Sequence, residues 1–92
     1  MIIKIKHKGL RLFWEKGETQ RLNANWIGRI DRIMNALDQA QSAADMDFPG
    51  FRLHQLRGAY QGFYAVDVSG NWRIVFRFDG RDVNDIDLID YH

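Results

Sequence analysis

The hydrophobic period of the sequence changes once, and that change constrains the fold more than any other feature. Up to about residue 44, apolar side chains recur three and four positions apart, the spacing of helices that bury one face. The segment Asp47-Phe48-Pro49-Gly50 interrupts this pattern, because proline removes a backbone donor and glycine permits a sharp turn. After it, apolar and polar residues alternate, as they do in strands. Helices in one half and hairpins in the other predict an α+β domain.

The first half of the chain contains one short strand and two helices by these criteria. Residues 2–6 are rich in isoleucine and predict an opening strand. A helix is predicted over residues 8–16, which Gly17 ends, and a longer one from about residue 24 to residue 44, with Asn23 as its N-cap. The face of the longer helix that should pack on the core carries Ile27, Ile30, Met34, Leu37 and Gln41.

The second half predicts four strands in sequence. Residues 51–54 alternate, and residues 63–68 and 72–78 form a hairpin with Ser69-Gly70-Asn71 as its turn. Residues 83–91 supply the last strand. The predicted order is therefore β-α-α-β-β-β-β, with an antiparallel meander in the second half.

Length and composition restrict the class of protein. A chain of 92 residues, 46% hydrophobic, is predicted to fold as one domain over residues 1–92. It has no cysteine, and its apolar runs fall short of the ~20 residues that a membrane helix needs, so we expect a soluble cytoplasmic protein without membrane contacts. The three histidines do not follow a metal-binding spacing and no phosphate-binding glycine loop is visible, so no metal and no cofactor are expected.

The net charge of +1 combines a basic body with an acidic tail. Residues 1–78 hold twelve of the thirteen Lys and Arg and seven of the twelve acids, a net charge of +5; residues 79–92 hold one base and five acids, a net charge of −4. A basic body attracts phosphates and an acidic tail repels them. Charge alone does not separate a nucleic-acid surface from an ordinary mixed one.

One side of the predicted sheet gathers basic side chains. Residues two apart in a strand share a face, which places Arg73, Val75 and Arg77 on one side of their strand. Arg52 and His54 share a face in the same way, and all four basic residues are predicted to line one open side of the sheet. Arginine can bind a phosphate bidentately, and histidine can transfer a proton near neutral pH. An ordinary solvated sheet face has the same residue types, so this pattern alone leaves catalysis open.

Four stretches of the chain match a family pattern in the same order. They are His7-Lys8-Gly9-Leu10, Phe48-Pro49-Gly50-Phe51-Arg52-Leu53-His54, the hairpin with Asn71-Trp72-Arg73, and the terminal Asp90-Tyr91-His92. Together they cover essentially the whole chain, and they resemble the HigB-type toxins of the RelE/ParE superfamily, also called killer proteins of plasmid-maintenance systems. The resemblance implies a RelE-like fold, with two N-terminal helices packed on a curved, mainly antiparallel sheet.

The same resemblance implies an activity. Family members are ribosome-dependent endoribonucleases that cut messenger RNA in the ribosomal A site and so inhibit translation. The ribose 2′-hydroxyl is the nucleophile, and the protein supplies acid, base and charge without a metal. By this resemblance His54 and His92 form the proton-transfer pair, in either order, and Arg73 contacts the scissile phosphate. Tyr91 stacks on a base, and Asp90 either orients His92 or pairs with Arg73.

The resemblance also implies RNA-binding residues and partners. Arg52, Arg57 and Arg77 are the expected RNA-binding residues; many relatives have lysine at the position of Arg57, so an electrostatic role is expected for it. The turn Asp79-Gly80-Arg81-Asp82 differs from the family's pattern. The expected partners are the 30S decoding site, messenger RNA and a HigA-type helix-turn-helix antitoxin, with promoter DNA contacted only through the antitoxin.

Two other functions fit the same fold. A ParE-like toxin inhibits DNA gyrase without chemistry and would be indifferent to His54→Ala. A catalytically inert RNA-binding module would bind RNA in a salt-sensitive manner without making new ends. His54, Arg73 and the terminal residues favour the nuclease, because gyrase binding gives no evident reason to collect them.

Overall fold

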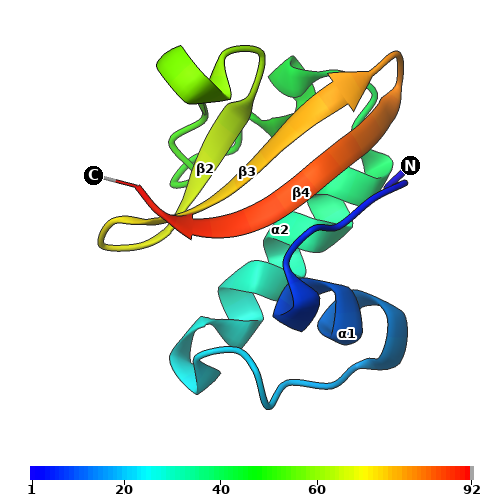
Figure 1. Ribbon diagram of the computed structural model, residues 1–92, viewed down its shortest axis with the longest axis vertical. Coiled ribbons are helices and arrows are strands. Elements are labelled where there is room, and N and C mark those ends of the chain that lie inside the picture. Colours follow the sequence, from blue (N-terminus) through cyan, green and yellow to red (C-terminus); the bar gives the residue numbers. More distant parts are fainter. Residues whose placement is uncertain (92) are drawn as a thin grey trace.

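The computed structural model describes residues 1–91 and shows two helices beside a four-stranded antiparallel sheet (Figure 1). The sheet order is β1-β2-β3-β4, so consecutive strands are neighbours and the predicted meander is confirmed. The elements are α1 (Lys8–Lys16), η1 (Ala24–Trp26), α2 (Ile27–Gln39), η2 (Ala43–Met46), β1 (His54–Gln55), η3 (Gly58–Tyr60), β2 (Tyr64–Ser69), β3 (Trp72–Asp79) and β4 (Asp82–Asp90), where η marks a 3₁₀ turn. No helix in residues 1–91 has the length and apolar character needed to cross a membrane.

The predicted opening strand is present only as two isolated bridges. Ile2 pairs with Val83 and Ile5 pairs with Ile86, both in parallel with β4. Each bridge is supported by backbone hydrogen bonds, such as the Ile3 amide to the Val83 carbonyl at 2.9 Å. The N-terminal segment therefore lies along the outer edge of β4, and most of the sheet remains antiparallel.

The first helix begins and ends where the sequence predicts. The Nδ1 atom of His7 accepts a hydrogen bond from the Leu10 amide at 3.1 Å, which caps the N-terminus. Burial lowers the pKa of His7, and the negative charge of Asp87 opposes that shift. Gly17 ends the helix in the left-handed conformation, with φ 71°.

The second helix is shorter than predicted. Asn23 does act as a cap, with its side chain accepting a hydrogen bond from the Asn25 amide, but the turn that it caps is η1 rather than α2. At the other end Ala40 is extended, with ψ 140°, and α2 ends at Gln39. Gln41 is therefore exposed, and its predicted place on the core face is wrong. The physical reason is that the chain turns sharply here and closes η2, with the Asp45 carboxylate accepting from the Gln41 amide at 2.9 Å.

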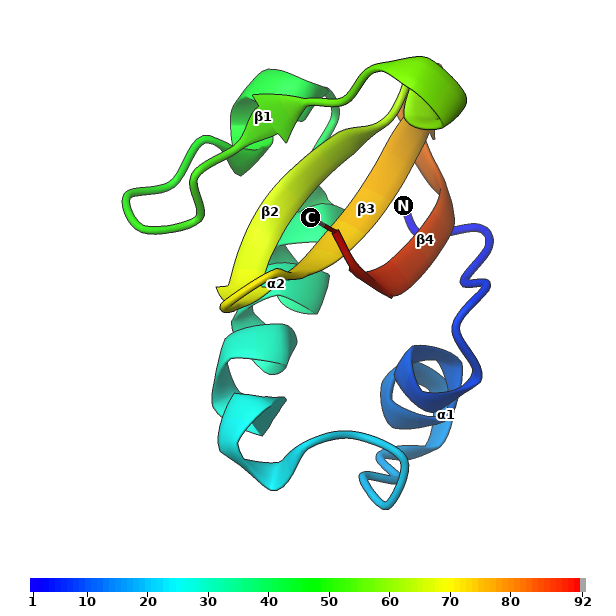
Figure 2. The ribbon, with the colours of Figure 1, turned by 60° about the vertical axis from the view of Figure 1, so that its left-hand side comes forward.

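The main core lies between α2 and one face of the sheet, as the two ribbon views show (Figures 1 and 2). The fully buried side chains in this layer are Ile30, Ile33, Met34 and Leu37 from α2 and Val66, Ile74, Phe76, Val83 and Ile86 from the strands. The helical spacing of the first group and the alternation of the second are what the sequence predicts for a helix packed on a sheet.

The opposite face of the sheet is partly covered, against expectation. Leu56, Ala65 and Val75 are buried there in a second, smaller cluster, with Tyr60 and Phe63 packed against it. The chain between β1 and β2 folds back over this face, where the Leu56 amide donates to the Phe63 carbonyl at 2.9 Å. Val75 is therefore not on an open surface, and the predicted basic face is interrupted.

Two register shifts twist the sheet. One lies between β2 and β3, at residues 67–69, and the other lies between β3 and β4, opposite Val75 and Arg77. At the second, Asp85 has a φ of 52°, as an extra residue in a bulge can have. Bulges increase the local twist of a sheet, and here the extra residue of β4 lies beside Arg77 of β3.

Candidate active site

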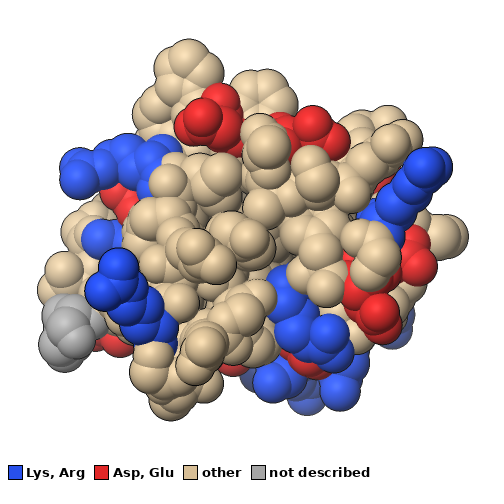
Figure 3. Space-filling model, turned by 90° about the horizontal axis from the view of Figure 1, so that it is seen from above, with Lys and Arg blue, Asp and Glu red and all other residues tan. Residues whose placement is uncertain are grey.

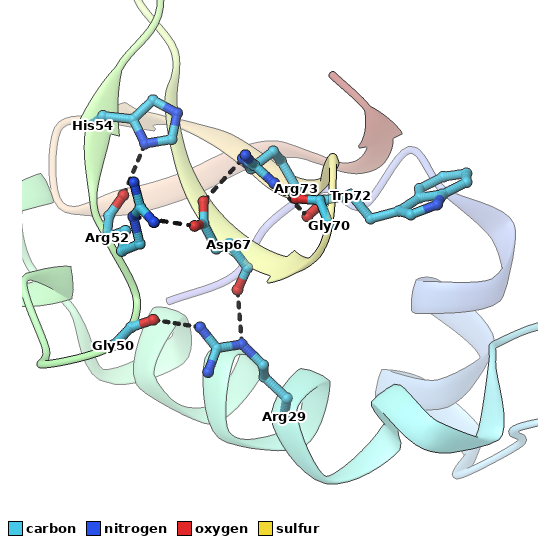
Figure 4. A network of polar contacts seen from close by, with 8 residues as sticks. All are labelled: Arg29, Gly50, Arg52, His54, Asp67, Gly70, Trp72 and Arg73. Atoms are coloured by element: carbon cyan, nitrogen blue, oxygen red, sulfur yellow. Dashed lines mark hydrogen bonds and ion pairs between the residues drawn. The ribbon is translucent and has the colours of Figure 1, made fainter. Parts of the chain in front are cut away.

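An open hollow of about 550 Å³ lies where β1, β2 and β3 meet (Figure 4). Its lining consists of Arg52, Leu53, His54, Asp67 and Arg73. Three of these residues were predicted as site residues from the sequence. The structure therefore brings Arg52, His54 and Arg73 together, and it adds a carboxylate between the two arginines.

His54 is held in one tautomer by the backbone. Its Nδ1 atom lies 2.7 Å from the Arg52 carbonyl oxygen. A carbonyl can only accept, so Nδ1 carries the proton in this contact, and in the neutral ring Nε2 is then the atom with a free lone pair. Figure 4 shows Nε2 directed away from Arg52. The side chain is half-buried in β1, which pairs His54 with Ala65 of β2.

Arg52 does not share a strand face with His54. Its backbone is left-handed, with φ 55°, and β1 contains only His54–Gln55, so the predicted strand over residues 51–54 is wrong. The reason is that the preceding loop is tied elsewhere, with the Phe51 carbonyl accepting from the Asp67 amide at 2.8 Å. Even so, the Arg52 side chain, which is 80% exposed, reaches the hollow and places Nε 3.4 Å from the Asp67 carboxylate.

Arg73 is the most constrained cation of the hollow. Its Nη1 donates to the Gly70 carbonyl at 2.6 Å and to the Trp72 carbonyl at 3.1 Å, and its side chain is 17% exposed. Its Nε lies 2.9 Å from Oδ1 of Asp67. Both atoms are buried, and the N–H is not directed at the oxygen well enough to form a hydrogen bond, so charge holds this pair together.

Sequence reasoning missed Asp67. It named Asp90 as a candidate partner of Arg73, and the structure places the carboxylate of Asp67 against Arg73. The signal was present: Asp67 is the one acid in the Tyr64–Ser69 run, and the hairpin turn pairs β2 with the strand that contains Arg73. An acid opposite an arginine in a hairpin favours a cross-strand ion pair.

Arg29, on α2, was also missed. Its Nε donates to the Asp67 carbonyl at 2.8 Å, and its Nη2 donates to the Gly50 carbonyl at 2.5 Å. Its guanidinium lies over the Phe51 ring, 5.5 Å from the centroid. Arg29 thus joins the helix to β2 and to the loop that precedes β1 (Figure 4). No feature of the sequence indicated this contact, because the helical pattern places Arg29 outside the apolar face.

Arg77 lies apart from the hollow. Its Nε donates to the Asp85 carboxylate at 2.6 Å, and Lys4 lies 3.7 Å from the same carboxylate. The hydrogen bond from Arg77 lowers the pKa of Asp85, and the positive charges of Arg77, Lys6 and Lys4 add to the shift while burial opposes it. The prediction that Arg77 lines one open face with Arg73 is wrong, because Val75 between them is buried under the β1–β2 connection and Arg77 binds the Asp85 carboxylate of β4 instead of lining the hollow. From above, Lys and Arg side chains stand in several separate groups around the outline of the molecule, with other residues between them (Figure 3).

Arg57 and Tyr91 do not line the hollow. Arg57 is exposed and lines another hollow, of about 400 Å³, together with residues of the β1–β2 connection. Tyr91 is 36% exposed; its amide donates to the Asn71 carbonyl at 2.8 Å, and its ring centroid is 6.3 Å from that of Tyr60. Asp90 pairs with Trp72 across the sheet.

His92 lies outside the described residues. Within residues 1–91, no three His, Cys, Asp or Glu side chains form a group that could hold a metal ion.

Comparisons with known proteins agree with the resemblance. Residues 3–92 match the family model described as a RelE-like toxin of the type II toxin–antitoxin system HigB. The chain is 37% identical over 92 residues, all of both chains, to a protein from Proteus vulgaris named Endoribonuclease HigB. It is 31% identical over 87 residues, 91% of this chain and 92% of the other, to Toxin HigB-1 from Vibrio cholerae serotype O1.

Solved structures support the fold. A crystal structure of a mutant of YafQ from E. coli is similar with a TM-score of 0.60 and 13% identity, over 95% of this chain and 87% of that one. YafQ from E. coli strain BL21(DE3) gives a TM-score of 0.54 with 11% identity over the same shares. At these identities the structures show the fold alone, and it is the predicted RelE-like fold. The family match and the full-length relatives show that the chain belongs to the HigB-like family of RelE-like toxins of type II toxin–antitoxin systems.

Proposed function

We propose that this toxin is a ribosome-dependent endoribonuclease that cuts messenger RNA in the ribosomal A site and so inhibits translation. Residues 1–92 would act as one domain in the cytoplasm, where ribosomes are found. The relative from Proteus vulgaris is named an endoribonuclease. The observation that carries the proposal is the fixed tautomer of His54, which leaves Nε2 able to accept a proton in a hollow that also contains Arg73.

The proposed reaction breaks one bond and forms one. The ribose 2′-oxygen attacks the adjacent phosphorus, the bond to the 5′-oxygen breaks, and a cyclic 2′,3′-phosphate and a free 5′-hydroxyl result. A base takes the proton of the 2′-hydroxyl, and an acid gives a proton to the departing 5′-oxygen. His54 and His92 would take these two roles, with Asp90 orienting His92. No external nucleophile is needed.

Arg73 would stabilise the charge that develops on the phosphate. Its Nη1 is bonded to two carbonyls and its Nε faces Asp67, so the guanidinium is oriented before any substrate arrives. A donor that is already oriented needs no reorganisation when charge develops, which is the basis of electrostatic catalysis. Arg52 and Arg57 would contact neighbouring phosphates, and Tyr91 would stack on a base, which contributes ~1–3 kcal/mol. Arg77 is assigned to its ion pair with Asp85 rather than to RNA.

A type II toxin has an antitoxin partner. For this chain we propose a HigA-type helix-turn-helix antitoxin, through which alone the complex would contact promoter DNA. The other partners would be the 30S decoding site and messenger RNA.

A cleavage assay with purified ribosomes tests the function. A defined messenger in the decoding site would be exposed to wild type and to His54→Ala, with free messenger as a second substrate and primer extension to locate ends. We expect new ends only on the ribosome, and a loss of about 10²–10⁴-fold in the variant, the usual contribution of a general acid or base. His7→Asn, which removes a histidine but keeps a capping side chain, should cut normally.

Two results would reject the proposal. In the first, the protein folds and inhibits growth but makes no new RNA ends, and both wild type and His54→Ala inhibit DNA supercoiling by gyrase to the same extent. That result would identify a ParE-like toxin. Salt-sensitive RNA binding without cleavage would identify an inert RNA-binding module.

A further inference from the structure

Asp67 places a negative charge where the proposed substrate brings another. The hollow contains two arginines, and the carboxylate between them lowers their combined charge by one. If the hollow served only to bind phosphate, this carboxylate would weaken it, because each additional cation favours an RNA backbone. A benefit other than affinity must therefore come from Asp67.

That benefit is visible in the contacts of Arg73. A free arginine side chain has several rotatable bonds, but here the guanidinium is held on two sides, by Asp67 at Nε and by the Gly70 and Trp72 carbonyls at Nη1. Without the Asp67 carboxylate, the guanidinium of Arg73 would be held only through Nη1 and could rotate about that contact. The same carboxylate reaches Arg52 with its other oxygen, at 3.4 Å.

The backbone of Asp67 is itself fixed. Its amide donates to the Phe51 carbonyl at 2.8 Å, and its carbonyl accepts from Arg29 at 2.8 Å. Arg29 also binds the Gly50 carbonyl, so one side chain of α2 fixes β2 relative to the loop that leads to Arg52 and His54. Figure 4 shows this chain of contacts from the helix to the hollow.

We propose that Asp67, held by Arg29, is the positioning residue that orients Arg73 and Arg52 for catalysis at the expense of RNA affinity. The inference rests on the proposed function and adds a residue to its site. It requires that loss of the carboxylate change binding and catalysis in opposite directions. A residue with only a structural role would reduce both together.

Asp67→Asn separates the two effects. We expect tighter binding of a single-stranded RNA oligonucleotide with a steeper salt dependence, and a single-turnover cleavage rate on the ribosome that falls by about 10–100-fold, since small misplacements of catalytic groups cost this much. Asp67→Glu, which keeps the charge, should recover part of the rate. Glu15→Gln on α1 is the matched control: it makes the same change in net charge at an exposed position away from the hollow and should change neither quantity.

Arg29→Lys tests the support of Asp67. Lysine keeps the net charge but cannot bind the two carbonyls as a fork. The cleavage rate should fall, by less than in Asp67→Asn, and the salt dependence of RNA binding should stay at its wild-type value.

The outcomes are distinguishable from failure of the proposed function. If wild type cuts no messenger, the function fails, and the positioning is still decided by RNA binding and by ¹⁵N NMR relaxation of the Arg73 Nε–H, which should show a restricted side chain in wild type and a more mobile one in Asp67→Asn. An equally restricted Arg73 in the variant, wild-type cleavage by the variant, or weaker RNA binding together with slower cleavage would each overturn the proposal.

Discussion

Strand β3 carries two arginines four residues apart, and each meets an aspartate in a different way. Arg77 and Asp85 share an aligned hydrogen bond of 2.6 Å, whereas Arg73 and Asp67 lie 2.9 Å apart without alignment. Each carboxylate also has a second, exposed cation nearby: Lys4, 63% exposed, at 3.7 Å from Asp85, and Arg52, 80% exposed, at 3.4 Å from Asp67. The composition of the two clusters is nearly the same.

The difference lies in what else holds each arginine. Arg77 depends on its carboxylate, and together they join β3 to the bulge of β4. Arg73 is anchored by two backbone carbonyls besides Asp67, and it lines a hollow with a histidine. Residue type and spacing therefore do not distinguish the structural ion pair of Arg77 from the pair that we propose to act in catalysis; backbone anchoring and access to an open hollow do.

The largest expected effect is the loss of the Arg73 side chain. Arg73→Ala should lower ribosome-dependent cleavage by about 10²–10³-fold, the usual effect of removing one oriented donor from a site where charge develops. Single-turnover cleavage measures it. If Arg73→Ala and Arg77→Ala reduced cleavage equally, the distinction between the two clusters would be broken.

Arg77→Ala should act on stability instead. It leaves the Asp85 carboxylate, 14% exposed, with the charges of Lys4 and Lys6 but without its hydrogen bond from Arg77, and loss of a hydrogen bond between charged groups costs about 1.5–3 kcal/mol. Urea denaturation should show this decrease in the free energy of unfolding, while cleavage by the folded variant stays at the wild-type rate. A variant as stable as wild type would contradict the structural role.

The pH dependence of stability sharpens the same contrast. The pKa of Asp85 is lower in the folded protein than its ordinary value of 3.8, so the unfolded chain binds more protons at this residue. The stabilisation that ionised Asp85 gives the folded protein is fully present above about pH 4 to 5, and it is lost as the pH falls through the folded-state pKa of this residue. Asp85→Asn should therefore flatten the acid limb of a curve of unfolding free energy against pH. An unchanged acid limb would show that Arg77 does not favour the charged form.

The smallest effects belong to the exposed cations. Lys4→Ala and Arg52→Ala should each change the free energy of unfolding by no more than about 1 kcal/mol, because exposed ion pairs contribute little. RNA binding should separate them, with a lower affinity and a shallower salt dependence for Arg52→Ala alone. Equal RNA binding by the two variants would remove Arg52 from the site.

Much of the fold follows from local signals. Gly17 ends α1, Asn23 caps the next turn, and Gly70-Asn71 closes the hairpin one residue later than predicted, because each depends on the conformational preferences of a few neighbouring residues. The end of α2 was mispredicted because Ala40 and its neighbours are good helix formers, and the turn there depends on Asp45 and on packing.

The site was only partly predictable for a related reason. Strand alternation predicted His54 and Arg73 on one side of the sheet, the family resemblance implied their roles, and the structure brings them together. Asp67 was missed although its place opposite Arg73 in the hairpin gave a signal, whereas the contact of Arg29 with the Asp67 carbonyl spans 38 residues and leaves no pattern in the sequence. The open face expected for Arg73 and Arg77 failed because strand alternation does not show what covers a face, and the β1–β2 connection buries Val75 between the two arginines.

The parallel bridges from Ile2 to Val83 and from Ile5 to Ile86 join the start of the chain to its end, and this matters while the ribosome is still synthesising the chain. At about 5–20 residues per second, on the order of ten seconds of translation separate residue 2 from residue 83. During that interval the isoleucines of the N-terminal segment have no strand to pair with. Lys4 and Lys6, which alternate with them, are the kind of charged residue that keeps a short apolar strand from joining other nascent chains. The two lysines would thus act before the sheet exists, by protecting a segment that must wait for its partner.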